Sequence, residues 1–322
     1  MAIPIRVPGA HADASTLVAA RATLLRHMGQ HASWKAAETR IAESLRALFS
    51  AHPPQLRRLD MQTAPAILDQ VVRFEAVHAV RGLFDLRRRL ENDRRCYALF
   101  SDALPDEPLV FIELAFTQGL AGDVTALLDT QSVIADPASC DSAMFYSISS
   151  CHEGLRGIPF GNLLIRLVVE RLQQELPWLT TFATVSPVPG FRAWLAQQAE
   201  RRGADLRRLV DLLDAGEWTS RPELSAQLEA LLMPLCAAYL VHAKRGNEPL
   251  DPVARFHLGN GARLERINWN GDRSKAGYER SAGIVANYVY DVAAIDTNRE
   301  TYASTHNVMA APSVEHLAGV AA

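Results

Sequence analysis

The chain has 322 residues, of which 48% are hydrophobic and 21% charged, and its formal net charge at pH 7 is −3. This composition is that of a globular protein with a sizeable core, and the length fits one large domain or two modest ones. The charge balance gives no global basic field for nucleic acid or an anionic membrane, so an acidic ligand must be held by local arginines and backbone amides.

The cysteines and the apolar stretches bear on the cellular location of the protein. The cysteines are Cys96, Cys140, Cys151 and Cys236. They form neither a CxxC pair nor a His/Cys cluster at zinc spacing, so we interpret them as reduced, mostly buried thiols. The longest apolar stretch, residues 230–241, contains Pro234 and is shorter than the ~20 residues of a membrane span. The N-terminus lacks the pattern of a secretory signal. We therefore expect a cytoplasmic protein with no membrane partner and no nucleic-acid partner.

Helical spacing of apolar residues dominates the first part of the chain. Residues 1–14 are expected to form a loose arm, and residues 15–49 are expected to be helical. The two prolines in AHPPQ break this pattern. Shorter helices are expected over residues 63–72 and 83–90, and the second ends in the charged run RRRLENDRR, which is typical of a solvated face.

Strand-like sequence begins near residue 94. The candidate strands are residues 94–100, 109–116, 142–149 and 179–186. Apolar residues at helical spacing predict a helix over residues 161–176, which Pro177 ends. The last two strands and this helix predict a β-α-β unit. We therefore predict an α+β protein with an N-terminal helical segment over residues 1–75, followed by a mixed β-sheet domain with flanking helices over residues 76–304.

Beyond residue 190 the pattern is mainly helical. The expected helices are residues 204–214, 222–245, 278–290 and 295–303. Residues 256–272, FHLGNGARLERINWNGD, are expected to form a loop. The tail, residues 305–322, is expected to be disordered.

A glycine-rich segment, GLRGIPFGN at residues 154–162, connects a predicted strand to a predicted helix. Backbone N–H groups and the positive end of a helix at such a junction can bind an anion, typically a pyrophosphate. A plain tight turn would leave the same pattern. The segment lacks the GK[ST] of a Walker loop and the glycine spacing of a dinucleotide fingerprint. Among pyrophosphate ligands, coenzyme A best suits a mixed sheet with a β-α-β unit.

The segment FATVSPVPGFRAWL, residues 182–195, places Ser186 at the end of a β-prone run and follows it with two prolines and a glycine. A serine held in this way suits a fixed hydrogen-bonding group. It also suits the cap of a helix that begins near Val188. No G-x-S-x-G elbow of a hydrolase triad surrounds it.

His257 lies between Phe256 and Leu258, ahead of a Gly-Asn-Gly turn. A histidine in an apolar setting is more often a satisfied core residue than a functional one. Nearby asparagines and Asp272 provide fixed dipoles, which favour a binding site.

Several segments, taken in this order, resemble the malonyl-CoA decarboxylase family. They are FYSIS…GLRGIPFGNLLI, FATVSPVPGFRAWL, LDPVARFHLGNGARLERINWNGDRS and SAGIVANYVYD, with RFEAVHAVRGLFDLRRRL…DRRCYALF upstream. The resemblance implies a GNAT-like (acyl-CoA acyltransferase-type) catalytic domain behind a helical domain that is short here. It implies a carboxy-lyase of fatty acid metabolism that converts malonyl-CoA to acetyl-CoA and CO2 without a metal or an organic cofactor.

The resemblance also implies site residues. Ser186 and His257 would form the catalytic pair, and Ser274 and Tyr290 would support it. The loop that cradles the pyrophosphate of coenzyme A would consist of Arg156, Gly157, Ile158, Pro159, Phe160, Gly161 and Asn162. This loop departs from the R/Q-x-x-G-x-G/A pattern of acetyltransferases. A homodimer or tetramer is expected, because the N-terminal helices carry apolar faces that a small bundle would not fully cover.

The chemistry of a malonyl thioester supports this interpretation. Loss of CO2 leaves an enolate, so the protein must stabilise charge on the thioester oxygen and then protonate carbon. A fixed hydroxyl and an imidazole meet these needs, and the sequence leaves open which of Ser186 and His257 has which role. Two other functions stay open: an acyltransferase on the same fold, and a non-catalytic sensor that binds coenzyme A.

Overall fold

The structure is a computed structural model, and it describes residues 12–27 and 33–320. The chain divides into two compact units. Unit 1 contains residues 1–114 and 147–177, and unit 2 contains residues 115–146 and 178–322. Most of the loose arm expected at the N-terminus lies outside the described residues.

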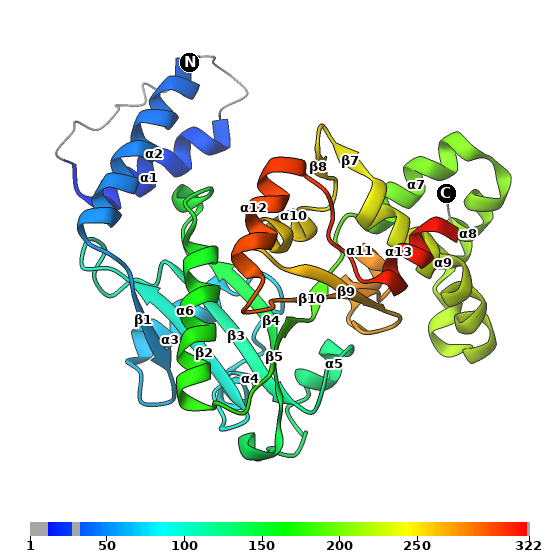
Figure 1. The fold of residues 1–322 in the computed structure, drawn as a ribbon, viewed down its shortest axis with the longest axis horizontal. Helices are drawn as coiled ribbons and strands as arrows, with labels where there is room; N and C mark the ends of the chain where they lie inside the picture. The colour runs from blue at the N-terminus through cyan, green and yellow to red at the C-terminus, as the bar shows by residue number, and fades with distance from the viewer. Residues whose placement is uncertain (1–11, 28–32, 321–322) are drawn as a thin grey trace. The chain divides into compact units, whose positions relative to one another are not determined.

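Two helices open unit 1, as the apolar spacing predicts (Figure 1). They are α1 (Ala14–His27) and α2 (Ser33–Ala51). Leu17 and Leu24 of α1 are buried, and so are Ile41 and Leu45 of α2. These side chains are therefore covered within a single chain. They do not supply the uncovered apolar surface from which the sequence predicts an oligomer.

The sheet of unit 1 begins with a strand that the sequence does not predict. Its strands, in order, are β1 (Gln55–Leu59), β2 (Arg94–Phe100), β3 (Val110–Thr117) and β4 (Ser142–Ser150), the last two continuing into unit 2. Strand β1 runs antiparallel to β2, with Gln55 opposite Phe100 and Leu59 opposite Cys96. The all-helical assignment of residues 1–75 is therefore wrong at β1. The short segment QLRRL is mostly exposed and lacks the alternation that marks a half-buried strand.

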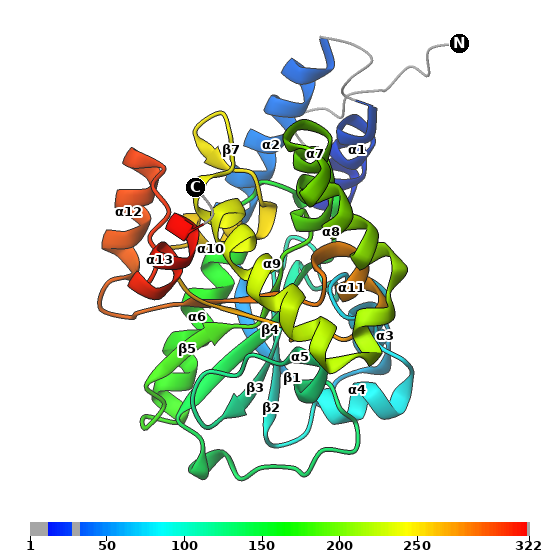
Figure 2. The ribbon, with the colours of Figure 1, turned by 90° about the vertical axis from the view of Figure 1, so that its right-hand side faces the viewer.

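Helices cover both faces of these strands. They are α3 (Pro65–Phe74), α4 (Leu83–Arg89) and α6 (Phe160–Glu175). Cys96 and Ala98 of β2 pack with Val71 of α3, while the Tyr97 hydroxyl points the other way and donates to Glu175 of α6 at 3.4 Å. This is the two-residue period of a strand buried on both sides. Figure 2 shows α6 on one side of the strands and α3 and α4 on the other.

The sheet of unit 2 is mixed. The additional strands are β5 (Thr181–Thr184), β6 (Ser186–Pro187), β9 (Arg263–Asn268) and β10 (Val285–Val289). Strand β5 runs parallel to β4, so the connection through α6 is the predicted β-α-β unit. Strand β10 runs antiparallel to β5, β6 and β9. A separate small hairpin consists of β7 (Lys244–Arg245) and β8 (Glu248–Pro249).

The remaining helices lie in unit 2. They are α5 (Val124–Leu127), α7 (Phe191–Arg202), α8 (Ala204–Ala215), α9 (Pro222–His242), α10 (Pro252–Gly259), α11 (Lys275–Ser281), α12 (Ile295–Thr305) and α13 (Pro312–Val320). The α+β class, the N-terminal helices, the mixed sheet and its flanking helices are therefore confirmed. So are the strands predicted between residues 94 and 186 and the helix at 161–176.

Two predictions after residue 255 are wrong. The expected loop at 256–272 contains the end of α10 and strand β9. The expected helix at 278–290 ends at Ser281 and is followed by β10. Ala282 and Gly283 have φ angles of 54° and 76°. This left-handed backbone ends a helix and turns the chain, and the buried run that follows forms a strand.

The predicted disorder of the tail is wrong over residues 312–320, which form α13. Val314 and Ala318, four residues apart on one helix face, are buried. The backbone N–H of Leu264 donates to Met309 O, which joins the segment before α13 to β9. The tail is thus ordered by packing on unit 2.

Helix α9 is the one helix among the described residues that is long and apolar enough to cross a membrane. The core helix of a soluble protein meets the same criterion of length and composition. Leu228, Leu232 and Leu240 of α9 are buried in the core, and Pro234 lies inside the helix.

Candidate active site

Ser186 and His257 meet in unit 2. The Ser186 Oγ and the His257 Nε2 lie 3.0 Å apart, and each residue is 5% exposed. Ser186 stands in β6, directly after β5, and His257 stands in the last turn of α10. The two segments are 71 residues apart in sequence. The structure therefore brings together the two residues that the sequence selects separately.

Backbone pairing fixes the position of Ser186. The Val185 N–H donates to Phe145 O at 2.9 Å, and Ser186 pairs with Ala286 of β10. Helix α7 begins only at Phe191, with Gly190 as its N-cap and no side-chain capping bond. Ser186 is therefore not the cap of the following helix, and its hydroxyl faces His257 instead.

A buried carboxylate, Asp251, connects the segments that carry Ser186 and His257. Its Oδ1 accepts from the N–H groups of Val253 and Ala254, both at 2.9 Å, and so caps α10. The Tyr239 hydroxyl donates to Oδ2 at 3.3 Å, and the Gly190 amide provides a further hydrogen bond. Burial raises the pKa of Asp251, and the hydrogen bonds from the backbone lower it in part. The carboxylate thus holds the end of the Ser186 turn against the start of the His257 helix.

Two buried tyrosines surround the His257 ring. Its Nδ1 lies 2.7 Å from the Tyr290 hydroxyl, and the Tyr288 ring stacks on it with centroids 4.7 Å apart and planes at 24°. Burial lowers the pKa of His257 to about 3. The imidazole is therefore neutral near pH 7, with both nitrogens in hydrogen bonds. Full burial and satisfied nitrogens also describe a core histidine, so the bond to Ser186 is what sets this ring apart.

Thr184 is a member of the site that the sequence analysis misses. Ser186 Oγ donates to Thr184 Oγ1 at 2.9 Å, and the Tyr288 N–H donates to the same oxygen at 3.1 Å. Residues 184 and 186 are two apart in an extended segment, and this spacing puts their side chains on one side. This two-residue spacing is the sequence signal that could have identified Thr184. It points to Thr184 only after Ser186 is taken as a functional residue.

Ser274, for which the resemblance implies a supporting role in the site, caps a helix in the structure. Its Oγ accepts from the Gly277 N–H at 3.0 Å and caps α11. Tyr290 contacts His257 directly. The side-chain hydrogen bond of Ser274 is instead the helix cap. A supporting role for Ser274 in the site stays a prediction.

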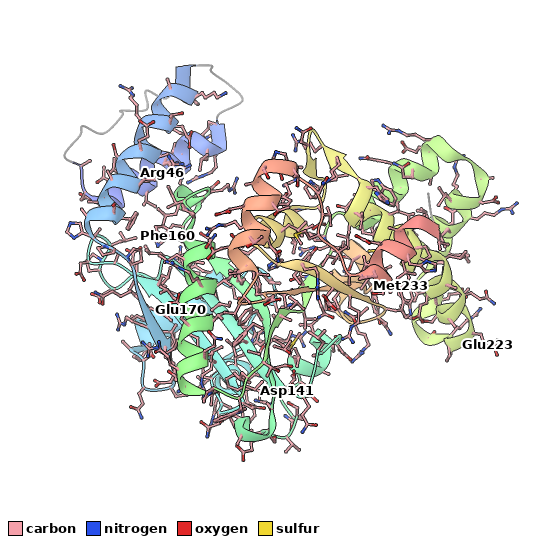
Figure 3. All side chains as sticks on the ribbon, in the orientation of Figure 1. Arg46, Asp141, Phe160, Glu170, Glu223 and Met233 are labelled. Carbon is pink, nitrogen blue, oxygen red and sulfur yellow. The ribbon has the colours of Figure 1, made fainter. Side chains whose placement is uncertain are left out.

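The glycine-rich loop lies in unit 1, before α6. Arg156 and Gly157 are exposed, and Gly157 has φ of 77°, which favours glycine. Helix α6 begins at Phe160 without a side-chain cap, so its first N–H groups lack intrahelical partners. The N–H groups of Ile158 and Phe160 donate to Leu155 O at 3.0 Å and to Ile158 O at 2.8 Å, so an anion would be bound by other N–H groups of this junction. Phe160, labelled in Figure 3, packs edge-on against Phe49 of α2 with centroids 5.1 Å apart.

The N-terminal helices support this loop from behind. Arg21 of α1, which is buried, donates from Nη1 to Gly154 O at 2.7 Å and pairs through Nη2 with Glu38 of α2 at 2.7 Å. A Cβ on Gly154 would lie 2.0 Å from Val18 O. The close approach of α1 therefore requires a glycine at this end of the loop.

The side chains of the described residues form no group of three or more His, Cys, Asp or Glu that could hold a metal ion. The four cysteines, all within the described part of the chain, are buried and form no disulfide.

Comparison with known proteins identifies relatives over most of the chain. The family model described as the malonyl-CoA decarboxylase C-terminal domain matches residues 54–321. The mitochondrial malonyl-CoA decarboxylase of Anser anser anser is 35% identical over 291 residues, covering 83% of this chain and 58% of that protein. The enzyme of the same name from Rattus norvegicus is 33% identical, with 83% and 59% covered. The chain thus spans somewhat more than half the length of these relatives.

Two solved structures are similar to the fold. The malonyl-CoA decarboxylase of Rhodopseudomonas palustris superposes with a TM-score of 0.87 at 38% identity, covering 94% of this chain and 75% of that one. The malonyl-CoA decarboxylase of Agrobacterium vitis gives a TM-score of 0.88 at 40% identity with the same coverage.

We expect Asp251→Ala to lower the free energy of unfolding more than Ser274→Ala does. Both substitutions remove a helix cap, which costs about 0.5–2 kcal/mol. The first also leaves the Tyr239 hydroxyl and the Gly190 amide without their acceptor in a buried position, where an orphaned group costs about 1–3 kcal/mol more. Chemical denaturation of both variants measures the difference. Equal losses would mean that Asp251 is a cap alone and does not hold the Ser186 turn.

Proposed function

The chain belongs to the malonyl-CoA decarboxylase family, and on that basis we propose that it is a carboxy-lyase that converts malonyl-CoA to acetyl-CoA and CO2. The observation that carries the proposal is the buried Ser186–His257 pair, closed on its far side by Tyr290. The proposed partners are the two thioesters, and the reaction uses no cofactor beyond the coenzyme A of the substrate.

The proposed reaction needs donors for a charge that exists only briefly. The bond between the α-carbon and the carboxylate carbon breaks, CO2 leaves, and the electron pair stays on the α-carbon and the thioester oxygen as an enolate. The α-carbon then takes a proton from water, which leaves hydroxide to be neutralised by the solvent. A fixed donor to the oxygen is worth roughly 3 kcal/mol in a water-excluded site. Ser186 and His257 are both nine-tenths or more buried and offer such donors.

The protonation state of His257 restricts its role. With a pKa lowered to about 3 by burial, the imidazole carries no charge near pH 7. It therefore acts as a neutral N–H donor or through the Ser186 hydroxyl, and not as an imidazolium acid. A general base for an amine acceptor must take up a proton, and burial lowers the pKa of His257 to about 3, so its imidazole is a weak base. This favours decarboxylation over acyl transfer to an amine.

The loop from Arg156 to Asn162 is proposed to bind the pyrophosphate of coenzyme A. Support comes from the uncapped start of α6, the exposed Arg156 and the left-handed Gly157. The acyltransferase-like (GNAT) scaffold and a place in fatty acid metabolism belong to the same proposal.

The proposal extends to two further properties, the location and the oligomeric state. A cytoplasmic location is supported by the four buried cysteines, which form no disulfide and suit a reducing compartment. A homodimer or tetramer is proposed from the sequence expectation, although Leu17, Leu24 and Ile41 of the N-terminal helices are buried within one chain. Light scattering at micromolar concentration tests it, and a monomer would overturn it.

Replacing Gly157 or Gly161 by valine is expected to weaken coenzyme A binding, because a side chain there obstructs the approach of a phosphate to the backbone N–H groups. Calorimetry with coenzyme A measures the effect. Gly216→Val is the matched control, since Gly216 also has a positive φ, 70°, and lies at the end of α8. Unchanged affinity in both loop variants would remove the loop from the site.

Ser186→Ala and His257→Asn are each expected to lower kcat for CO2 release from malonyl-CoA on the order of 10²-fold, the scale for loss of one donor to a developing oxyanion. Coenzyme A affinity should hardly change. The double variant should be little worse than the poorer single variant, because groups that act as a unit are not additive. The kcat profile of the wild type should show no inflection near pH 6.5 from His257.

The assay of CO2 release from malonyl-CoA contains no amine acceptor. Turnover only after addition of an amine would instead support an acyltransferase, and binding without turnover would support a sensor. Near-normal kcat in either single variant would assign that residue a structural role.

A further inference from the structure

We infer that Thr184 is a positioning residue that fixes the direction of the hydrogen-bond chain through Ser186, His257 and Tyr290. This inference deepens the proposed function and rests on it for its kinetic consequence. Its structural content, the position of the hydrogen on His257, can be tested without any assumption about the substrate.

Thr184 is held through both its side chain and its backbone. Its Oγ1 accepts the Tyr288 N–H at 3.1 Å, and its backbone oxygen accepts from Asn287 Nδ2 at 2.6 Å. The Asn287 side chain is fully buried and also donates to Ala121 O at 2.8 Å. Its Oδ1 accepts from Asn268 Nδ2 at 2.8 Å. Thr184 is therefore fixed by β10 through both side chain and backbone, and it offers Ser186 a stationary acceptor.

A hydroxyl has one hydrogen, and this determines which atoms donate in the other hydrogen bonds of the series. Ser186 donates its hydrogen to Thr184 at 2.9 Å. The 3.0 Å contact between Ser186 Oγ and His257 Nε2 then requires the hydrogen to be on Nε2. In a neutral imidazole this leaves Nδ1 bare, so the 2.7 Å contact with Tyr290 requires the phenol to donate. All donors point one way, from Tyr290 to His257, to Ser186 and to Thr184.

This direction assigns the roles that the sequence leaves open. Nε2 already carries a hydrogen, so His257 cannot take a proton from Ser186, and Ser186 is a donor instead of a nucleophile. When a thioester oxygen gains charge nearby, the Ser186 hydrogen turns from Thr184 to that oxygen. The N–H of His257 strengthens this donor by polarising the hydroxyl. No bond to hydrogen breaks in this step.

Loss of the Thr184 hydroxyl removes the acceptor that keeps the Ser186 hydrogen pointing away from His257. The Ser186 hydrogen then turns to His257 Nε2, and the imidazole hydrogen moves to Nδ1 and faces Tyr290. In that arrangement the Ser186 lone pairs face the enolate and oppose it. Ser186 and His257 are still packed and hydrogen-bonded to each other, but Ser186 is now the donor and His257 the acceptor.

The test compares wild type with Thr184→Val, which removes the hydroxyl at similar volume, and Thr184→Ser, which keeps it. Thr181→Val is the matched control, because Thr181 lies in the same strand and is half-buried. In the wild type, the ¹⁵N shifts of His257 at pH 7 should show a protonated Nε2 and a bare Nδ1. Thr184→Val should move the hydrogen to Nδ1, while Thr184→Ser and Thr181→Val should resemble the wild type.

The kinetic readout is CO2 release from malonyl-CoA. We expect kcat to fall about 10-fold to 100-fold in Thr184→Val, no more than for loss of the donor itself, with coenzyme A affinity unchanged and with recovery in Thr184→Ser. Thermal unfolding of each variant shows whether it is folded. If Thr184→Val does not fold, the tautomer of the wild type and the kcat of Thr184→Ser still decide whether the inference holds.

A wild-type His257 protonated on Nδ1 would overturn the inference, and so would a Thr184→Val protein with unchanged tautomer or unchanged kcat. A wild-type protein without turnover of malonyl-CoA would overturn the proposed function, whereas the ¹⁵N measurement would still test the direction of the chain.

Discussion

The arrangement of the site depends on one buried carboxylate. Asp251 caps the helix that carries His257 and accepts hydrogen bonds from Tyr239 and from the Gly190 amide, which ends the turn after Ser186. A Cβ on Gly190 would lie 2.2 Å from the Tyr239 hydroxyl, so this close approach requires glycine. The prolines between Ser186 and Gly190 stiffen the connecting turn. A shift of the carboxylate would change the distance between the serine and the histidine, although it touches neither.

Burial then determines the chemistry of the pair. Burial lowers the pKa of His257 to about 3, and burial raises the pKa of Tyr290 well above its ordinary value. Both groups therefore stay neutral over the physiological range and act through hydrogen bonds. In a medium of low dielectric such bonds act strongly on any charge that develops beside them.

Much of the fold can be predicted from the sequence, because β2, β3 and β4 are buried runs of apolar residues between turn signals. Strands β9 and β10 could not be predicted this way. RLERIN has two buried residues and VANYV includes a buried asparagine, so their strand character depends on pairing with each other. Ser186 and His257 were selected by local pattern and family resemblance. Thr184 and Asp251 were not, because their roles exist only once segments distant in sequence meet.

The neutrality of the Ser186–His257 pair fits the charge balance of the proposed reaction. The malonyl carboxylate is charged in the ground state and leaves as neutral CO2, while the thioester oxygen gains charge. A cation near the carboxylate would stabilise the ground state more than the transition state and would slow the reaction. Neutral donors aimed at the thioester oxygen gain strength only as the enolate forms. A hydroxyl backed by an uncharged imidazole, as Ser186 and His257 provide, therefore suits loss of CO2 better than an imidazolium or a lysine would.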